Sequence, residues 1–232
     1  MALLIGMHVA LSQEKDIDQN DQQWIQYYGS LDLSDQWILS LDGGYRVKNK
    51  FRDKSQFISR MAIAYRLSAF AKLGGGFAFL GFYEDKEISR LEYRPYQELE
   101  MVRTIGKIDL SHKFRLEERF FVAKNPENSS EKNSFNFRFR YQIQVLIPVY
   151  KFNKNKEISL LIANEVFLNA GKEISHNIFD QNRLMVGPGF QFFSNLSAYL
   201  IYNYQFASTP TANRYLASDI LWLKIYHNFT LE

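Results

Sequence analysis

The stretch FNFRFRYQIQV, residues 135–145, alternates between apolar and polar side chains at almost every position. An alternation with a period of two is typical of a β-strand that has one apolar face and one polar face. Phe135, Phe137 and Phe139 then share one face, and Arg138 and Arg140 share the other. The stretch leaves open whether the apolar face packs against a protein core or against lipid.

The same alternation recurs along the whole chain, and no segment shows a helical period over several turns. The strands expected from this pattern are 23–32, 37–47, 57–67, 72–82, 91–102, 107–122, 135–148, 157–169, 182–193, 196–206 and 219–231. They predict an all-β chain folded as an antiparallel up-and-down transmembrane β-barrel of about 10–12 strands. Because bacterial barrels have an even number of strands, we expect ten or twelve, with a further strand in 14–22 as one way to reach twelve.

The connections between these segments alternate between short and long. The short ones are 33–36, 68–71, 103–106 and 194–195, and the longer, polar ones include 48–56, 83–90, 124–134, 171–181 and 207–218. Tight turns at one end and longer loops at the other are typical of outer-membrane barrels.

The composition excludes several other classes of protein. Mean hydropathy is −0.30, and no stretch beyond the N-terminus approaches the run of about 20 apolar residues that a membrane helix needs. The chain has no cysteine, so it forms neither disulfides nor thiolate metal sites. Its net charge of +3 is spread along the chain, which does not favour nucleic acid as a partner.

Three features favour lipid over a protein core on the apolar face. The expected strands are about ten residues long, which suits a tilted crossing of the hydrocarbon layer. Aromatic residues gather toward the strand ends, as they do in membrane girdles. The polar face is rich in arginine, which forms bidentate pairs with carboxylates in sheltered places.

We therefore predict a charge-paired lumen. Its expected members are Arg60, Arg66, Glu92, Arg94, Glu98, Glu100, Arg115, Glu117, Arg119, Arg138, Arg140, Glu165 and Arg183. The acidic residues Glu92, Glu98 and Glu100 could instead bind calcium or magnesium. Pairing with Arg94, Arg115 and Arg119 is the favoured interpretation, so we expect no metal and no cofactor.

The N-terminal sequence MALLIGMHVALSQ resembles the apolar region and cleavage site of a secretory signal. Residues 1–13 are therefore expected to be a signal peptide, without the usual positive start. Residues 14–22 are then a polar segment, and residues 23–232 form a single barrel domain.

Four polar residues lie in register with the lipid-facing side chains: His112, Glu118, Asn164 and His227. A histidine with a carboxylate or amide at the lipid face could serve a hydrolase or acyltransferase. No matching serine or aspartate is evident, however. The favoured alternatives are a β-bulge near Glu117 and Glu118 that swaps the two faces, or a place for the histidines at the membrane interface.

Four stretches carry a resemblance to a known family: RLEYRPYQ at 90–97, LSHKFRLEERF at 110–120, NEVFLN at 164–169 and FDQNR at 179–183. Together they resemble a domain-of-unknown-function family of small outer-membrane β-barrels from Gram-negative bacteria. The resemblance implies a signal peptide, an outer-membrane barrel and an undetermined activity. It implies no catalytic residues.

These observations predict a protein of the cell outer membrane, in contact with membrane lipid and lipopolysaccharide and open to a protein partner in the membrane. The expected function is that of a structural or interaction scaffold, or of a narrow pore. A membrane-embedded lipid hydrolase or acyltransferase is the alternative, and a soluble lipid-binding barrel with its aromatic residues inside is a second alternative.

Overall fold

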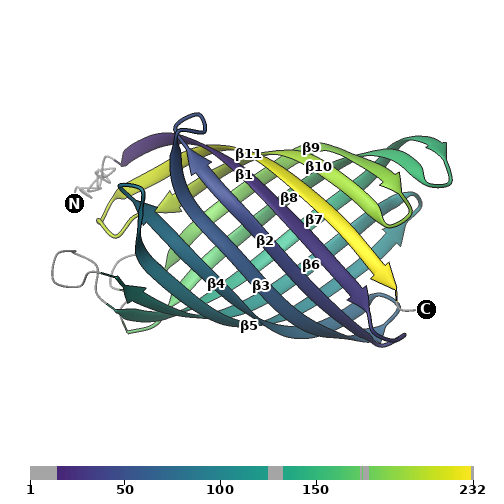
Figure 1. The fold of residues 1–232 in the computed structure, drawn as a ribbon, viewed down its shortest axis with the longest axis horizontal. Helices are drawn as coiled ribbons and strands as arrows, with labels where there is room; N and C mark the ends of the chain where they lie inside the picture. The colour runs from purple at the N-terminus through teal and green to yellow at the C-terminus, as the bar shows by residue number, and fades with distance from the viewer. Residues whose placement is uncertain (1–14, 125–132, 173, 175–177, 231–232) are drawn as a thin grey trace, which may run out of the picture.

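The structure is a computed structural model that describes residues 15–124, 133–172, 174 and 178–230. These residues form a closed barrel whose strands are strongly tilted to its long axis (Figure 1). Its strands are β1 (Asp16–Asp32), β2 (Trp37–Lys48), β3 (Asp53–Ser68), β4 (Ala71–Glu84), β5 (Glu87–Ile105), β6 (Ile108–Ala123), β7 (Ser134–Asn153), β8 (Lys156–Ala170), β9 (Phe179–Phe193), β10 (Leu196–Ser208) and β11 (Arg214–Thr230). The part of the chain that is described contains no helix long and apolar enough to cross a membrane. The predicted fold class, an antiparallel meander closed into a barrel, is confirmed.

The barrel closes through a parallel pair, β1 with β11, while every other neighbouring pair is antiparallel. The register of this pair runs from Asp16 beside Arg214 to Asp32 beside Thr230, and Figure 1 shows the two strands side by side. The expectation of an even number of strands is wrong. In a meander of eleven strands the first and the last run in the same direction, so closure requires a parallel pair.

The barrel starts at Asp16, so the expected boundary near residue 23 is wrong. Residues Asp16–Gln22 form the first part of β1, because their backbone pairs with residues Arg214–Ile220 of β11. They do not form a separate strand. The expected signal peptide, 1–13, lies outside the described residues.

Connections at one end of the barrel, here called the turn end, are short: residues 33–36, 69–70, 106–107, 154–155 and 194–195. At the opposite end, the loop end, consecutive strands are separated in sequence by residues 49–52, 85–86, 124–133, 171–178 and 209–213, of which 125–132, 173 and 175–177 are not among the described residues. The expected loop over 83–90 is only a two-residue turn. Its residues Asp85 and Lys86 both have positive φ, 47° and 71°, as a type I′ hairpin turn requires.

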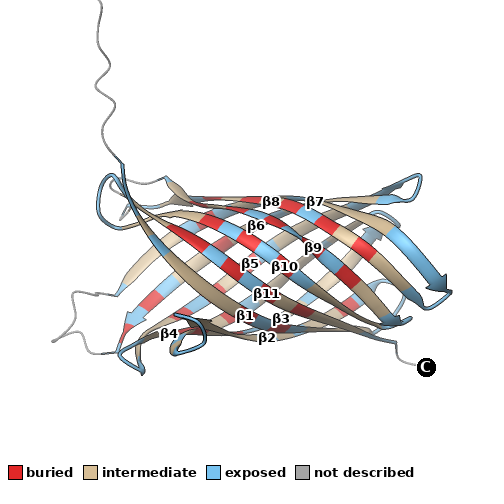
Figure 2. Cartoon of the chain, turned by 90° about the horizontal axis from the view of Figure 1, so that it is seen from above, coloured by how far each residue is buried: buried red, intermediate tan, exposed pale blue. Residues whose placement is uncertain are grey.

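The two faces of the sheet are arranged as predicted, with apolar side chains outside. Phe137 is 37% exposed and Leu200 47%, whereas Arg138 is 6% exposed. Buried and exposed positions alternate along the strands (Figure 2). This arrangement contradicts a soluble barrel with its aromatic residues inside.

Part of the inner surface is apolar, which the sequence analysis did not predict. One cluster spans β1 and β8 to β11 and consists of Trp24, Leu161, Ala163, Met185, Ile201, Ile220 and Trp222. A second consists of Ile58, Ala78, Leu80 and Tyr96 on β3, β4 and β5. The lumen is therefore narrowed by packed side chains as well as by charged ones.

Gly76 of β4 provides the space that Tyr96 occupies in the second cluster. A Cβ atom at Gly76 would lie 2.6 Å from the Tyr96 ring and 2.5 Å from the carbonyl oxygen of Met61. The neighbouring Gly75 has room, because its nearest atom would be the Tyr96 carbonyl oxygen at 3.5 Å.

We predict that Gly76→Ala lowers the free energy of unfolding by about 1–3 kcal/mol, the usual cost of overpacking. The matched control Gly75→Ala should change it by less than about 0.5 kcal/mol. Guanidinium chloride unfolding of the refolded barrels measures both values. Equal stabilities of the two variants would contradict this account of Tyr96 packing.

Candidate functional site

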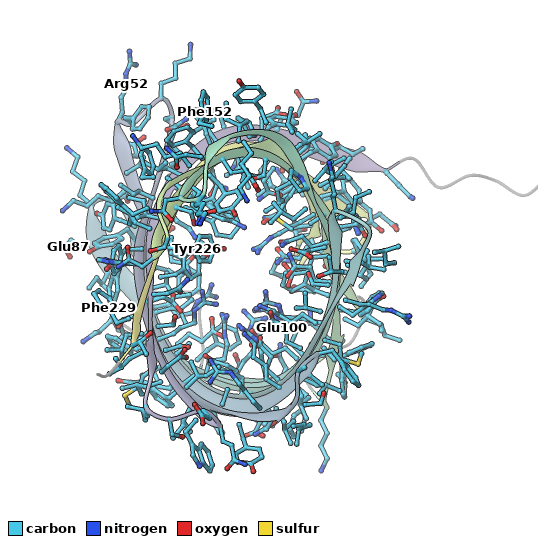
Figure 3. All side chains as sticks on the ribbon, turned by 90° about the vertical axis from the view of Figure 1, so that its right-hand side faces the viewer. Arg52, Glu87, Glu100, Phe152, Tyr226 and Phe229 are labelled. Atoms are coloured by element: carbon cyan, nitrogen blue, oxygen red, sulfur yellow. The ribbon has the colours of Figure 1, made fainter. Side chains whose placement is uncertain are left out.

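The barrel lumen contains a cavity of about 910 Å³. Its lining includes Ser208 and Leu216 toward the loop end and Gln144 and Asn228 toward the turn end. Viewed along the barrel, Glu100 and Tyr226 point toward the centre, and Phe152 and Phe229 point outward (Figure 3). The polar side chains of this barrel therefore lie mainly in the lumen, which makes the lumen the candidate functional site.

Glu117 of β6 is the centre of the charged wall. Its carboxylate is fully buried and lies 2.6 Å from the guanidinium groups of both Arg138 and Arg140 on β7. Arg94 and Arg115 lie further away, at 3.7 Å and 3.8 Å. One carboxylate is thus shared by four arginines, an arrangement that offsets the cost of burying its charge.

The network continues from Glu117 toward the loop end. Glu92, also fully buried, accepts hydrogen bonds of 2.7 Å from Arg94 and Arg119. Arg138 reaches Asp180 of β9 at 2.9 Å.

Across β8, Glu165 accepts hydrogen bonds from Arg140. Its carboxylate lies 3.8 Å from Arg183, whose Nε donates instead to Gln205.

Toward the turn end the cations are partly lysines. Glu98 accepts hydrogen bonds from Arg115, and Glu100 lies 3.2 Å from Lys113 and 3.5 Å from Lys72. The three acidic residues considered for a cation are therefore each engaged by basic side chains. Glu92 and Glu98 pair with arginines as expected, while Glu100 pairs with lysines.

All the predicted network residues except Arg66 line the cavity or are buried in its wall. Arg66 lies at the rim of the turn end, where it donates to Asp32 and to the carbonyl oxygens of Ser34 and Asp35. A separate pair, Arg60 with Asp42 at 2.9 Å, lies on β3 and β2.

Several inward residues were not predicted as members of the site: Trp24, Asp42, Arg46, Asp180, Trp222 and Lys224. Strand alternation alone places Asp42 and Arg46 opposite Leu41 and Tyr45, so the signal was present in the sequence. The two tryptophans carry no such signal because an inward aromatic residue departs from the simple rule of polar inside and apolar outside.

Cations outnumber acids along the cavity. The cations are Arg46, Lys48, Arg60, Lys72, Arg90, Arg94, Lys113, Arg115, Arg119, Arg138, Arg140, Arg183 and Lys224, and the acids are Asp42, Glu98, Glu100, Glu165 and Asp180. Adding the buried Glu92 and Glu117 to the acids does not reverse the balance. The lumen carries a net positive charge.

The four polar residues considered for catalysis lie on the outer face, each with its own partner. His112 Nδ1 lies 2.8 Å from the Tyr141 hydroxyl, and the Gln97 amide donates to Glu118 at 3.4 Å. Asn164 and Asn182 form a reciprocal amide pair at 3.1 Å, and His227 Nδ1 lies 3.0 Å from the Tyr27 hydroxyl.

The structure does not assemble these four residues into one site. His112 and Glu118 are six residues apart on β6, about 20 Å along the strand. Asn164 lies in line with His112 but on the far side of Ile143, about 10 Å away across two strand spacings. The suggested bulge near Glu118 is wrong, because β6 keeps one register with β5 and with β7 throughout.

The fold and its lumen define an inside-out β-barrel, with apolar side chains outside and paired charges within. A family described as "Protein of unknown function (DUF2490)" matches residues 21–216, and the chain belongs to this family. The resemblance carried by the four motifs to a domain-of-unknown-function family is thereby confirmed. Those motifs contain most of the charged wall, including Glu92, Glu117 and Glu165.

Comparison with curated proteins found no match. Among solved structures the chain is similar to one described as "NanC porin structure in rhombohedral crystal form". The two are 12% identical with a TM-score of 0.44, and the alignment covers 79% of this chain and 85% of that chain.

We predict that Glu117→Gln lowers the free energy of unfolding by about 3–5 kcal/mol, because it leaves the surrounding arginines buried without their shared anion. The matched control is Glu118→Gln, the same change one position along on the outer face. It should cost less than about 0.5 kcal/mol. Guanidinium chloride unfolding provides the comparison, and a Glu117→Gln barrel as stable as the control would show that the network is dispensable.

Proposed function

We propose that this chain is an outer-membrane β-barrel that acts as a narrow pore. The observation that carries the proposal is a single cavity lined by residues from both ends of the barrel, inside a sheet whose outer face is apolar. Membrane lipid and lipopolysaccharide would surround the barrel. The expected signal peptide at residues 1–13 fits export to that membrane.

Aromatic rings on the outer face support the membrane part of this proposal. Toward the loop end, rings in contact include Tyr45, Phe57, Phe79, Tyr83, Tyr93, Phe120, Phe135, Phe137, Phe206 and Tyr215. Toward the turn end they include Trp37, Tyr65, Tyr150, Phe152, Phe190 and Phe192. Two such girdles are typical of the two interfaces of a membrane.

The spacing of the girdles fits a bilayer. On β3, Phe57 and Tyr65 are eight residues apart, which is about 20 Å along the axis for a tilt of about 40°. On β7, Phe137 and Tyr150 are thirteen residues apart, or about 33 Å on the same basis. These values bracket the apolar band of about 25 Å that membrane barrels present.

The width of the lumen supports a narrow pore rather than a wide one. Open aqueous channels occur at about 16 strands, whereas barrels of about eight are filled by their side chains. An eleven-stranded barrel lies between these limits. Its charged wall and inner apolar clusters occupy much of the interior and leave a restricted path.

The first prediction of the proposal concerns conduction. Refolded protein added to a planar bilayer should give stable current steps, smaller than those of a wide channel because side chains restrict the lumen. Single-channel recording measures the steps. If no current steps appeared in many insertions of a barrel shown to be folded in the same lipid, the proposal of a pore would be wrong, and a plugged scaffold would be the better description.

A second prediction concerns the outer surface. Ile143 lies near the middle of β7 and faces outward, and its neighbour Gln142 lines the cavity. Ile143→Arg should destabilise the inserted barrel by about 2–4 kcal/mol, the cost of a charge at the membrane midplane.

The control Gln142→Arg places the same charge in the lumen and should cost clearly less. Unfolding titrations in phospholipid vesicles compare the two variants. If Gln142→Arg lowered the free energy of unfolding more than Ile143→Arg, the assignment of the outer face to lipid and of the inner face to water would be wrong.

A further inference from the structure

Two inward cations beside the parallel seam have no acidic partner among the described residues. Arg46 of β2 donates a hydrogen bond to the amide oxygen of Gln56, and its guanidinium lies 3.8 Å from the centre of the Trp24 ring. The Lys224 ammonium of β11 lies 3.9 Å from the centre of the Trp222 ring. Within the described ranges, neither has a carboxylate within 4.0 Å, in contrast to the arginines around Glu117.

These cations and rings come together because the barrel closes by pairing β1 with β11. Trp24 and Trp222 are partners in the parallel register of β1 and β11, and Arg46 is the partner of Trp24 on β2. The two indole rings are 4.9 Å apart and meet edge to face. Arg183 of β9, which lies 3.8 Å from the Glu165 carboxylate, also approaches the Trp24 ring, at 5.2 Å.

The rings hold these cations in place but do not neutralise them. A cation–π contact contributes about 0.5–2 kcal/mol, less than an anion would contribute at a desolvated site. Arg46, Arg183 and Lys224 all line the cavity, so a solute in the lumen can reach them. The excess of cations along the whole cavity also favours a negatively charged solute.

Trp222 provides an independent observation. Its Nε1–H is buried and has no acceptor among the residues that the structure describes, although the side chain lines the cavity. A buried donor without a partner is uncommon in folded proteins, and it is satisfied when a ligand or a water supplies an acceptor. The Trp222 indole therefore adds a neutral donor beside the cations near the seam.

We propose that a cluster beside the seam binds a small solute through an oxyanion group, either a carboxylate or a phosphate. This cluster, here called the seam cluster, consists of Trp24, Arg46, Arg183, Trp222 and Lys224. Guanidinium groups match the paired oxygens of such groups, and basic rings select anions in other pores. The inference rests on the proposed pore, in which the seam cluster would be the point of anion recognition.

A binding experiment tests the site without requiring conduction. Trp37→Phe removes the tryptophan of the outer face, so that the remaining fluorescence comes from Trp24 and Trp222. The folded barrel in a neutral detergent is titrated with citrate, with inorganic phosphate and with uncharged glucose. We expect a saturable change with citrate, with phosphate or with both, and none with glucose, and the two anions distinguish carboxylate from phosphate recognition.

Variants then locate the site. Arg46→Gln and Lys224→Gln should each weaken the binding of the anion at least tenfold, and Arg46→Lys, which keeps the charge, should recover part of the loss. The matched control Lys113→Gln removes a lumen cation that is already paired with Glu98 and Glu100 and should change the affinity less than twofold. Heat-dependent migration on gels verifies that every variant is folded.

The outcomes separate the site from the pore. Current steps in bilayers, together with unchanged citrate and phosphate affinity in Arg46→Gln and Lys224→Gln, would overturn the site and keep the pore. If Lys113→Gln weakened anion binding as much as Arg46→Gln and Lys224→Gln do, the proposed site would also be wrong. The affinity would then depend on the total charge of the lumen and not on the seam cluster. Anion binding that depends on Arg46 and Lys224 in a barrel that never conducts would support the site and remove the pore.

Discussion

The central constraint on this molecule is that a charge buried inside the closed sheet needs a partner within it, either an opposite charge or an aromatic ring. Glu117 shows the consequence, since a fully buried carboxylate is acceptable only because Arg138 and Arg140 contact it directly. The neighbouring pairs follow from the same requirement, strand by strand around the wall. Alternation keeps these charges on the inner face and leaves the outer face to apolar side chains.

The parallel seam adds a second constraint, because it joins the two ends of the described chain in one register. It brings Trp24 beside Trp222 and places Arg46 and Lys224 on their rings. The lumen therefore has two different sides. One side balances arginine with glutamate. On the other, Arg46 and Lys224 lie against aromatic rings, and no carboxylate of the described residues comes within 4.0 Å of either.

The sequence was sufficient to predict the strands and their faces, because a period of two is a local property of residues such as Phe137 and Arg138. It was not sufficient for the partners of each charge, since whether Glu100 meets Arg or Lys depends on register between strands. A barrel was predicted, but the parallel pair that closes it was not, because the pairing of β1 with β11 joins residues almost 200 positions apart. The inner cluster around Leu161 and Ala163 was missed because both faces of β8 are apolar there.

The most direct test of the account uses the absence of cysteine from the chain. Single cysteines introduced at successive positions from Phe137 to Val145 can each carry a fluorophore in barrels refolded into vesicles of brominated lipid. The account predicts strong quenching at odd positions and weak quenching at even ones, because the odd side chains face acyl chains and the even ones face the lumen. Quenching without alternation, or with the opposite alternation, would contradict the inside-out arrangement and everything derived from it.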